Sequence, residues 1–208
     1  MKKIIALVAT MVAAVSFATA EITVGARGIF GLNVGSSLEG ADLAVGNSLT
    51  FGGALFANIP LAEAGPGAIA LQPELGFTHN SIGSSEDTPL GDADMTFSIN
   101  TIDIAALVGY NIKASDAITI TPLLGIQASI VAGDGHAETE LDGTTLYEVD
   151  GEVDASVLVS IPVGAEFMFK VGPGAIVADV RYNIGLNEID TGMTLRGLRL
   201  GVGYGIQF

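Results

Sequence analysis

The stretch LRLGVGYGIQF, residues 198–208, decides the fold. Large apolar residues occupy every second position, and glycine, arginine or glutamine stands between them. Strict alternation of this kind is typical of a β-strand that buries one face. A frayed chain end would be polar and irregular, so the stretch predicts a terminal strand that is paired along its whole length.

The first twenty residues form a segment of a different kind. Two lysines precede an apolar run over 4–17, and small residues at 18–20 form a cleavage site. This pattern predicts a secretory signal peptide, 1–20, that is removed from a mature domain spanning 21–208. A membrane-anchoring helix is the alternative, but the apolar run is short for a bilayer span. Removal of the two lysines changes the net charge from −15 to −17.

Period-two alternation recurs along the rest of the chain, whereas helical periodicity is hard to find. Each alternating stretch sets apolar residues against a face rich in Gly, Ser, Thr and Asn. The eight stretches are 22–34, 48–61, 68–80, 98–112, 118–131, 155–171, 176–186 and 197–208. Short connections alternate with long ones, and the long ones are 35–47, 81–97, 132–154 and 187–196.

These stretches predict an all-β fold, an eight-stranded antiparallel up-and-down transmembrane β-barrel. A soluble β-sandwich also alternates, but here the apolar face is unbroken and the polar face carries few solubilising charges. Strands that span lipid must close into a barrel because every backbone polar group needs a partner. Short turns then face the periplasm and long loops face outward, so we expect the bacterial outer membrane as the location.

The polar face carries eight charged residues, four of each sign. They are Arg27, Lys170, Arg181, Arg199, Glu74, Asp103, Glu166 and Asp179. Side chains fill the interior of an eight-stranded barrel, and a buried charge is tolerable only when it is paired. We therefore predict an interior ion-pair network centred on Asp179, Arg181 and Arg199. The alternative is that these residues share the polar face by chance and that their charges are solvated.

The long loops hold 16 of the 23 acidic residues, and 132–154 alone holds eight with no basic residue. Within this segment Asp142-Gly143 predicts a type I′ hairpin turn. The acidic loops are either a hydrated like-charged surface or a surface that attracts cations or a basic partner. No calcium-loop spacing is present, so no metal ligands are predicted.

These features resemble the small eight-stranded outer-membrane β-barrel family, the OmpA/OmpX-like and PorT-like barrels, over essentially the whole mature chain. LQPELGF (71–77) and VADVRYNIGL (177–186) are similar to segments of that family. The resemblance implies that the barrel assembly machinery reads a C-terminal signal in this chain. Its residues would be Val202, Tyr204, Ile206 and Phe208.

The leading functional interpretation is a non-enzymatic, monomeric outer-membrane protein. It would contact outer-membrane lipid and either support the envelope or present its acidic loops to an extracellular partner. A small-solute channel is the first alternative, although balanced charges would fill the lumen.

An enzyme is the second alternative. Lipid A deacylase barrels resemble this architecture and use a lipid-facing His-x-Ser pair with a nearby acid. His79 and Ser81 have that spacing, but the adjacent strands offer no outward acid. GVGYG (201–205) lacks the dinucleotide-binding spacing, and two histidines do not suffice for a multi-histidine metal site. No cofactor, metal or nucleic acid is therefore expected.

Overall fold

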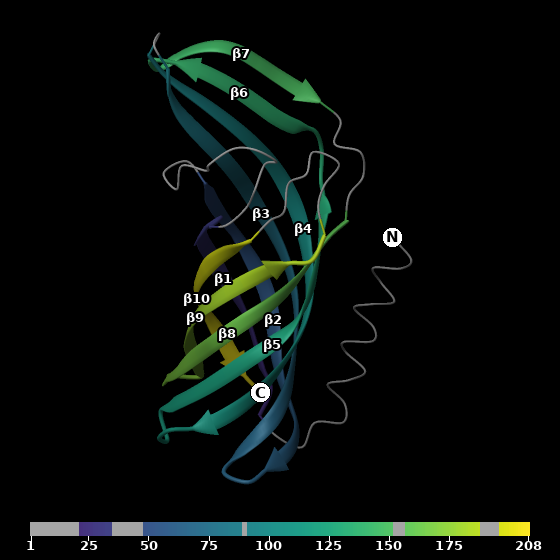
Figure 1. Ribbon diagram of the computed structural model, residues 1–208. Coiled ribbons are helices and arrows are strands. Elements are labelled where there is room, and N and C mark those ends of the chain that lie inside the picture. The colour runs from purple at the N-terminus through teal and green to yellow at the C-terminus, as the bar shows by residue number, and fades with distance from the viewer. Residues whose placement is uncertain (1–20, 35–47, 89–90, 152–156, 188–195) are drawn as a thin grey trace.

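The computed structural model describes residues 21–34, 48–88, 91–151, 157–187 and 196–208 (Figure 1). The predicted signal peptide lies outside the described residues. Within them, no helix is long and apolar enough to cross a membrane. The strands are β1 (Thr23–Leu32), β2 (Leu49–Ala64), β3 (Gly67–Thr88), β4 (Gly91–Lys113), β5 (Ile118–Val131), β6 (Gly135–Leu141), β7 (Thr144–Gly151), β8 (Val157–Val171), β9 (Gly174–Gly185) and β10 (Gly197–Gln207).

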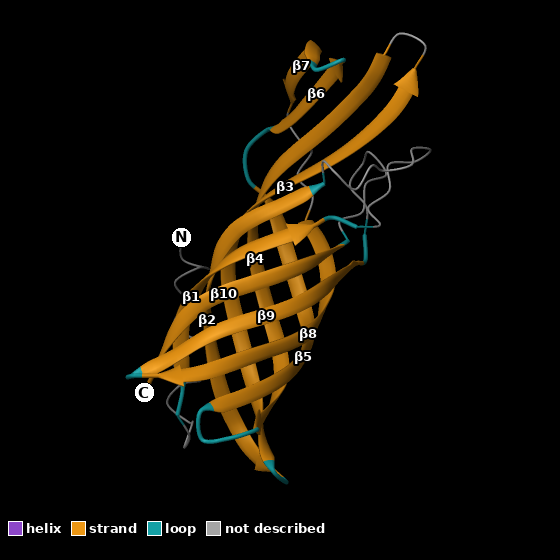
Figure 2. Ribbon diagram, turned by 90° about the vertical axis from the view of Figure 1, so that its left-hand side faces the viewer, coloured by secondary structure: helices purple, strands orange, loops and turns teal. Residues whose placement is uncertain are grey.

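Eight of these strands form a closed antiparallel ring in the order β1, β2, β3, β4, β5, β8, β9 and β10 (Figure 2). The last strand closes the ring on the first, with Thr23 opposite Gln207 at one end and Leu32 opposite Leu198 at the other. Closure removes both sheet edges. The predicted fold class is confirmed, and the terminal strand is paired along its length with β1 on one side and β9 on the other.

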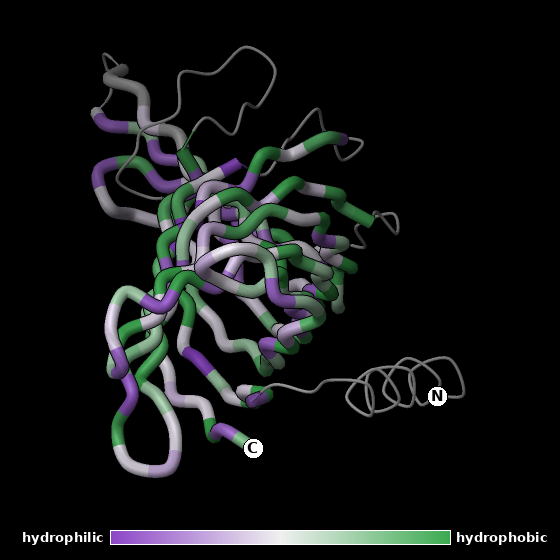
Figure 3. Tube along the Cα trace, turned by 90° about the horizontal axis from the view of Figure 1, so that it is seen from below, coloured by the Kyte–Doolittle hydropathy of each residue, from purple (hydrophilic) through white to green (hydrophobic). Residues whose placement is uncertain are grey.

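Hydrophobic and hydrophilic residues alternate along the strands (Figure 3), and the two kinds point to opposite faces of the wall. Large apolar side chains point outward and stay exposed, for example Phe30 at 69% and Val202 at 64%. Threonines, asparagines and charged groups point inward, and Thr78, Thr101 and Glu166 are completely buried. A soluble domain has the reverse arrangement, whereas a barrel in lipid needs an apolar outer band.

The segment 81–97 is not the loop that the sequence predicted. β3 and β4 continue through it as a hairpin beyond the ring, and β6 pairs with β4 from Ala93 to Ser98. β7 adds to β6 through the predicted turn, where Asp142 and Gly143 both have positive φ, 48° and 71°. We call the sheet formed by 81–88, 91–98, β6 and β7 the extracellular arm, after the expectation that the long connections face outward (Figures 1 and 2).

One β-bulge interrupts the pairing of β2 with β3, between Pro60 and Ala62. A bulge inserts an extra residue and so exchanges the two faces of the strand beyond it. Glu63 consequently lies opposite Ala68, on the inner face, although simple alternation would turn it outward. Ile59, beside the bulge, is completely buried where the sequence predicted a lipid-facing residue.

Candidate functional site

The centre of the lumen holds five charged side chains in mutual contact. Arg27 Nη1 lies 3.0 Å from Glu166 Oε2 and 3.0 Å from Asp179 Oδ2, and the same guanidinium pairs with Glu74. Arg181 lies 2.8 Å from Glu74 Oε2, 2.8 Å from Asp179 Oδ1 and 3.6 Å from Glu166 Oε2. Two guanidiniums thus share three carboxylates that come from β3, β8 and β9.

Neutral side chains complete this central cluster. Gln72 donates hydrogen bonds to Glu166 Oε2 at 2.8 Å and to Glu74 Oε1 at 2.9 Å. The Phe56 ring lies 5.2 Å below the Arg27 guanidinium, within range of a cation–π interaction. The sequence reasoning did not single out Gln72 or Phe56. Gln72 could have been found because it stands two residues from Glu74 and therefore shares its face.

A second pair lies above the cluster, toward the extracellular end. Arg199 stands directly opposite Arg181 on the neighbouring strand, and its Nη1 lies 3.8 Å from Asp103 Oδ2. Asp103 accepts hydrogen bonds from Thr78 at 2.8 Å and Thr101 at 3.1 Å. The network therefore has Arg27 and Arg181 at its centre, with three ion pairs each, whereas Arg199 lies at its margin with one.

The glycines of β10 make room for these side chains. Gly203 lies opposite Arg27, and Gly201 lies opposite Asp179. A Cβ on Gly203 would collide with the Ala26 carbonyl oxygen and meet the Cα and Cβ of Arg27 at 2.6 Å, and a Cβ on Gly201 would collide with the Asp179 carboxylate. Between Arg199 and Gln207, the lumen face of the terminal strand carries only glycines, and residues of the two neighbouring strands fill the space.

Lys170 does not join the network, so this part of the prediction is wrong. Its residue does have inward parity, but it lies one residue before the end of β8, opposite Ala175, and its side chain is exposed. Among the described residues it has no ion-pair partner. Alternation specifies the face of a strand and not the depth along it, which is why the sequence could not exclude Lys170.

The model of the autotransporter beta-domain family matches residues 17–197. The chain belongs to the autotransporter beta-domain family. This match, together with the barrel, confirms the expectation of a small outer-membrane barrel and its location in the bacterial outer membrane.

Solved structures similar to this autotransporter beta-domain include outer-membrane proteins. Neisserial surface protein A is 17% identical, with 91% of this chain and 99% of that chain covered and a TM-score of 0.47. OprG from Pseudomonas aeruginosa is 12% identical, with 92% and 97% covered and a TM-score of 0.48. Ail, the attachment invasion locus protein of Yersinia pestis, is 15% identical, with 90% and 98% covered and a TM-score of 0.42. The comparison with curated proteins found no match.

The residues of the expected assembly signal lie on the lipid face of this autotransporter beta-domain. Val202, Tyr204, Ile206 and Phe208 are all exposed, and the Tyr204 hydroxyl donates to the Val171 carbonyl at 3.1 Å. The backbone of Phe208 exchanges hydrogen bonds of 3.1 and 2.9 Å with Ile22. Phe208 is therefore held by the sheet, while its ring stays free on the outer surface.

His79 and Ser81 lie on the outer face of β3, and both side chains have polar partners among the described residues. The His79 Nδ1 is 3.0 Å from Asn100 Oδ1, and its ring packs on Phe51 with centroids 4.8 Å apart. The Ser81 hydroxyl bonds the backbone of Leu49 at 3.3 Å. Among the described residues, the side-chain amide of Asn100 is the partner of His79, whereas a hydrolase of this kind needs a carboxylate in that position.

The extracellular arm of this autotransporter beta-domain gathers acidic side chains on one face. The register aligns Asp94 with Glu140, Glu138 with Glu148, and His136 with Asp150. His136 Nδ1 lies 2.9 Å from Asp150 Oδ1. This hydrogen bond, with the negative charges nearby, raises the pKa of His136 above its ordinary value. No three His, Asp or Glu side chains among the described residues are placed to hold a metal ion.

Proposed function

We propose that this protein is a non-enzymatic, non-conducting outer-membrane barrel that binds a basic partner on the acidic face of its extracellular arm. The acidic face consists of Asp94, Glu138, Glu140, Glu148 and Asp150. The observation that carries the proposal is the sheet itself, an ordered platform of like charge that projects beyond the membrane-spanning ring (Figures 1 and 2).

The filled lumen supports the non-conducting part of the proposal. The cavity beside the central cluster measures about 30 Å³, and the next cavity toward the outside measures about 10 Å³. Volumes of this size hold about one or two water molecules each. An ion could pass only by breaking contacts between Arg27, Arg181 and their carboxylates, which is costly when one partner of a buried pair is left behind.

Like charges on the arm favour a cationic partner. Glu138 and Glu148 stand directly opposite each other on β6 and β7, a placement that destabilises a sheet. The arm segments 91–98 and 132–151 contain no lysine or arginine that could relieve the repulsion. A basic partner would supply the missing counter-charge and would be steered toward the arm by its field.

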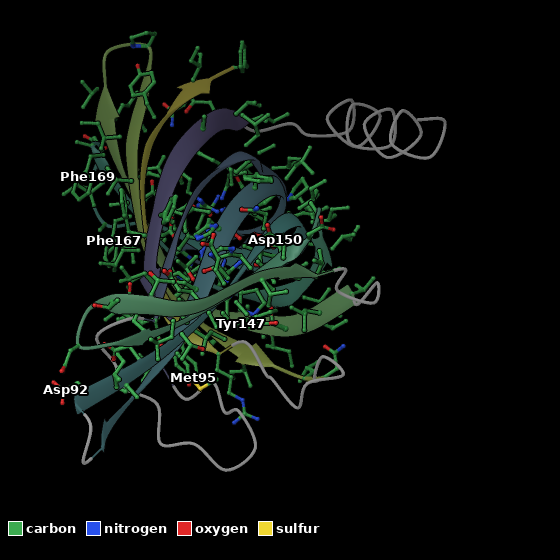
Figure 4. The ribbon with its side chains drawn as sticks, turned by 90° about the horizontal axis from the view of Figure 1, so that it is seen from above. Asp92, Met95, Tyr147, Asp150, Phe167 and Phe169 are labelled. Carbon is green, nitrogen blue, oxygen red and sulfur yellow. The ribbon has the colours of Figure 1, made fainter. Side chains whose placement is uncertain are left out.

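The acidic face is open to approach. Thr101 and Asp103 of β4 point into the lumen. Asp94, on the same strand, has the opposite parity, so the acidic face of the arm is continuous with the outer face of the barrel wall. The other face of the arm carries Met95 and Tyr147, which are labelled with Asp150 in Figure 4. β7 is the last strand of the sheet, and all of its residues are exposed.

The test uses the protein in lipid nanodiscs and a fluorescent octalysine peptide as the probe. We expect binding that weakens steadily as salt is added. The triple variant Glu138→Gln, Glu140→Gln, Glu148→Gln should bind about tenfold more weakly, since each exposed charge contributes about 0.5 kcal/mol. Equal binding by this variant and the unchanged protein would refute the proposal.

The matched control removes three acids from the other long connections, through Glu39→Gln, Asp42→Asn and Asp190→Asn. It changes the net charge equally, so retained binding assigns the interaction to the arm. Single-channel recording in planar bilayers tests the lumen separately. Stable, reproducible conductance steps would establish the channel alternative in place of the filled barrel.

A further inference from the structure

We propose that the periplasmic mouth of the barrel is a binding site for a short zwitterionic peptide. A cavity of about 720 Å³ opens at this end, between the wall and the β2–β3 hairpin, which reaches below the other turns (Figure 1). Small-molecule sites occupy about 300–1,000 Å³, so the space suits a ligand of two or three residues. We call it the periplasmic vestibule, lined by Glu21, Glu63, Asn111, Lys113, Lys170 and Gln207.

The vestibule is blind because an apolar layer closes it toward the lumen. Phe56, Met168, Ala175 and Val177 pack into one buried cluster between the vestibule and the central ion pairs. Met168 also lines the vestibule. A molecule that enters from the periplasm therefore meets a floor and does not continue into the barrel, which is what a binding site needs and a pore does not.

The charged groups of the vestibule are sorted by sign onto different parts of the rim. Glu21 precedes β1 and Glu63 lies on β2, whereas Lys113 lies at the end of β4 and Lys170 near the end of β8. These are the only two lysines between residue 21 and the end of the chain. Neither lysine has an ion-pair partner among the described residues, so both positive charges remain available to a carboxylate.

The bulge in β2 is what adds Glu63 to the acidic part of the rim. Without the extra residue between Pro60 and Ala62, Glu63 would have outward parity and would face lipid. On the same part of the rim, Gln207 on β10 has a buried Oε1 with no hydrogen-bond partner among the described residues. An acceptor in this position, beside a carboxylate, suits an ammonium or amide donor from a ligand.

The spacing across the wall matches a peptide. Glu63 and Lys113 are separated by the single strand β3, so their strands lie about 10 Å apart. An extended tripeptide spans about the same distance between its charged ends. Asn58 and Asn111, joined by hydrogen bonds of 2.8 and 3.3 Å, line the inner wall between the two parts of the rim. Amide side chains at this position suit the peptide groups of the ligand.

Methionine methyl groups allow a direct test on the intact protein. Two methionines lie in the described residues, Met168 in the vestibule and Met95 on the extracellular arm. The protein, labelled with ¹³C-methyl methionine in nanodiscs, is titrated with trialanine. We expect saturable shifts of the Met168 signal and an unchanged Met95 signal. Trialanine acetylated at its amino end or amidated at its carboxyl end should bind about fivefold more weakly, the effect of losing one exposed charge pair.

Two variants and a control complete the experiment. Glu63→Gln should weaken binding of trialanine but not of the acetylated peptide, and Lys113→Gln with Lys170→Gln should weaken binding of trialanine but not of the amidated peptide. Asp116→Asn, in the nearby turn but not in the vestibule lining, should change nothing. The proposal is overturned if Met168 does not respond, if Met95 shifts in parallel, or if capped and free peptides bind equally. Preserved heat-modifiable mobility shows that each variant is folded.

Discussion

Replacing Arg27 by methionine is the sharpest test of the central cluster. Arg27→Met keeps most of the side-chain volume but removes three ion pairs at once. Three buried carboxylates then share Arg181, and Glu166 keeps only its 3.6 Å contact with it. Removing one partner of a buried ion pair costs about 3–5 kcal/mol. We expect the free energy of unfolding to fall by about that amount.

Arg199→Met is the comparison, because it removes one ion pair of 3.8 Å and one hydrogen bond of 3.3 Å to Asn80. Its loss should be about 1–2 kcal/mol. The chain has no tryptophan, so urea unfolding in lipid vesicles is followed by far-ultraviolet circular dichroism and by heat-modifiable gel mobility. The double variant Arg27→Met, Glu166→Gln should recover about 2 kcal/mol, because the charge balance is partly restored. Equal losses for the two arginine variants, with no recovery in the double variant, would refute the reasoning.

Three further outcomes follow from the same geometry. Gly203→Ala should lower the free energy of unfolding by about 1–3 kcal/mol because the added methyl group meets Arg27. Gly28→Ala, whose methyl group would face lipid with its nearest neighbour at 3.9 Å, should be nearly neutral in the same urea titration. Because the pKa of His136 is raised in the folded arm, its stabilising effect is full below pH of about 6.5 and is lost as the pH rises through the raised value. Hydrogen exchange of the β6–β7 amides, corrected for intrinsic rates, should show this loss in the unchanged protein and not in His136→Gln. Deletion of Phe208 should reduce assembly into the outer membrane more than one lost apolar contact explains, as measured by the heat-modifiable fraction in membrane extracts; normal assembly would contradict its role as a signal.

The fold could be predicted because lipid imposes a simple rule on each spanning strand. Every second residue must be apolar, and stretches such as 197–208 follow this rule without exception. The extracellular arm could not be predicted in the same way. Outside the bilayer, water can form hydrogen bonds with the backbone, so residues 81–97 can form strands without an apolar outer face. Within the arm, the turn at Asp142-Gly143 could still be predicted, because its sequence preference does not depend on a membrane.

The candidate site was predictable in face but not in depth. Parity alone places Arg27, Glu166 and Asp179 inside the barrel, since a strand has only two faces. Which of these side chains contact one another depends on the stagger between the strands, and the alternation of apolar and polar residues contains no information about that stagger. Lys170 has inward parity but lies too near the mouth of the barrel to reach the cluster. Glu63 has outward parity in the sequence but faces inward because of the bulge that precedes it. Phe56 was missed although parity places it inward with Ala54 and Asn58, because the prediction expected only polar and small residues on the lumen face.

The central cluster also constrains how the barrel reaches the membrane. Arg27 lies on the first strand, and its partner Glu166 is 139 residues further along the chain. In a partial sheet of the first strands, Glu74 on β3 is the one carboxylate of the cluster within reach of Arg27. The other two carboxylates, and Arg181, arrive with β8 and β9. Charged side chains exposed to hydrocarbon are strongly unfavourable, so we expect the complete cluster to favour the closed ring over partly inserted sheets.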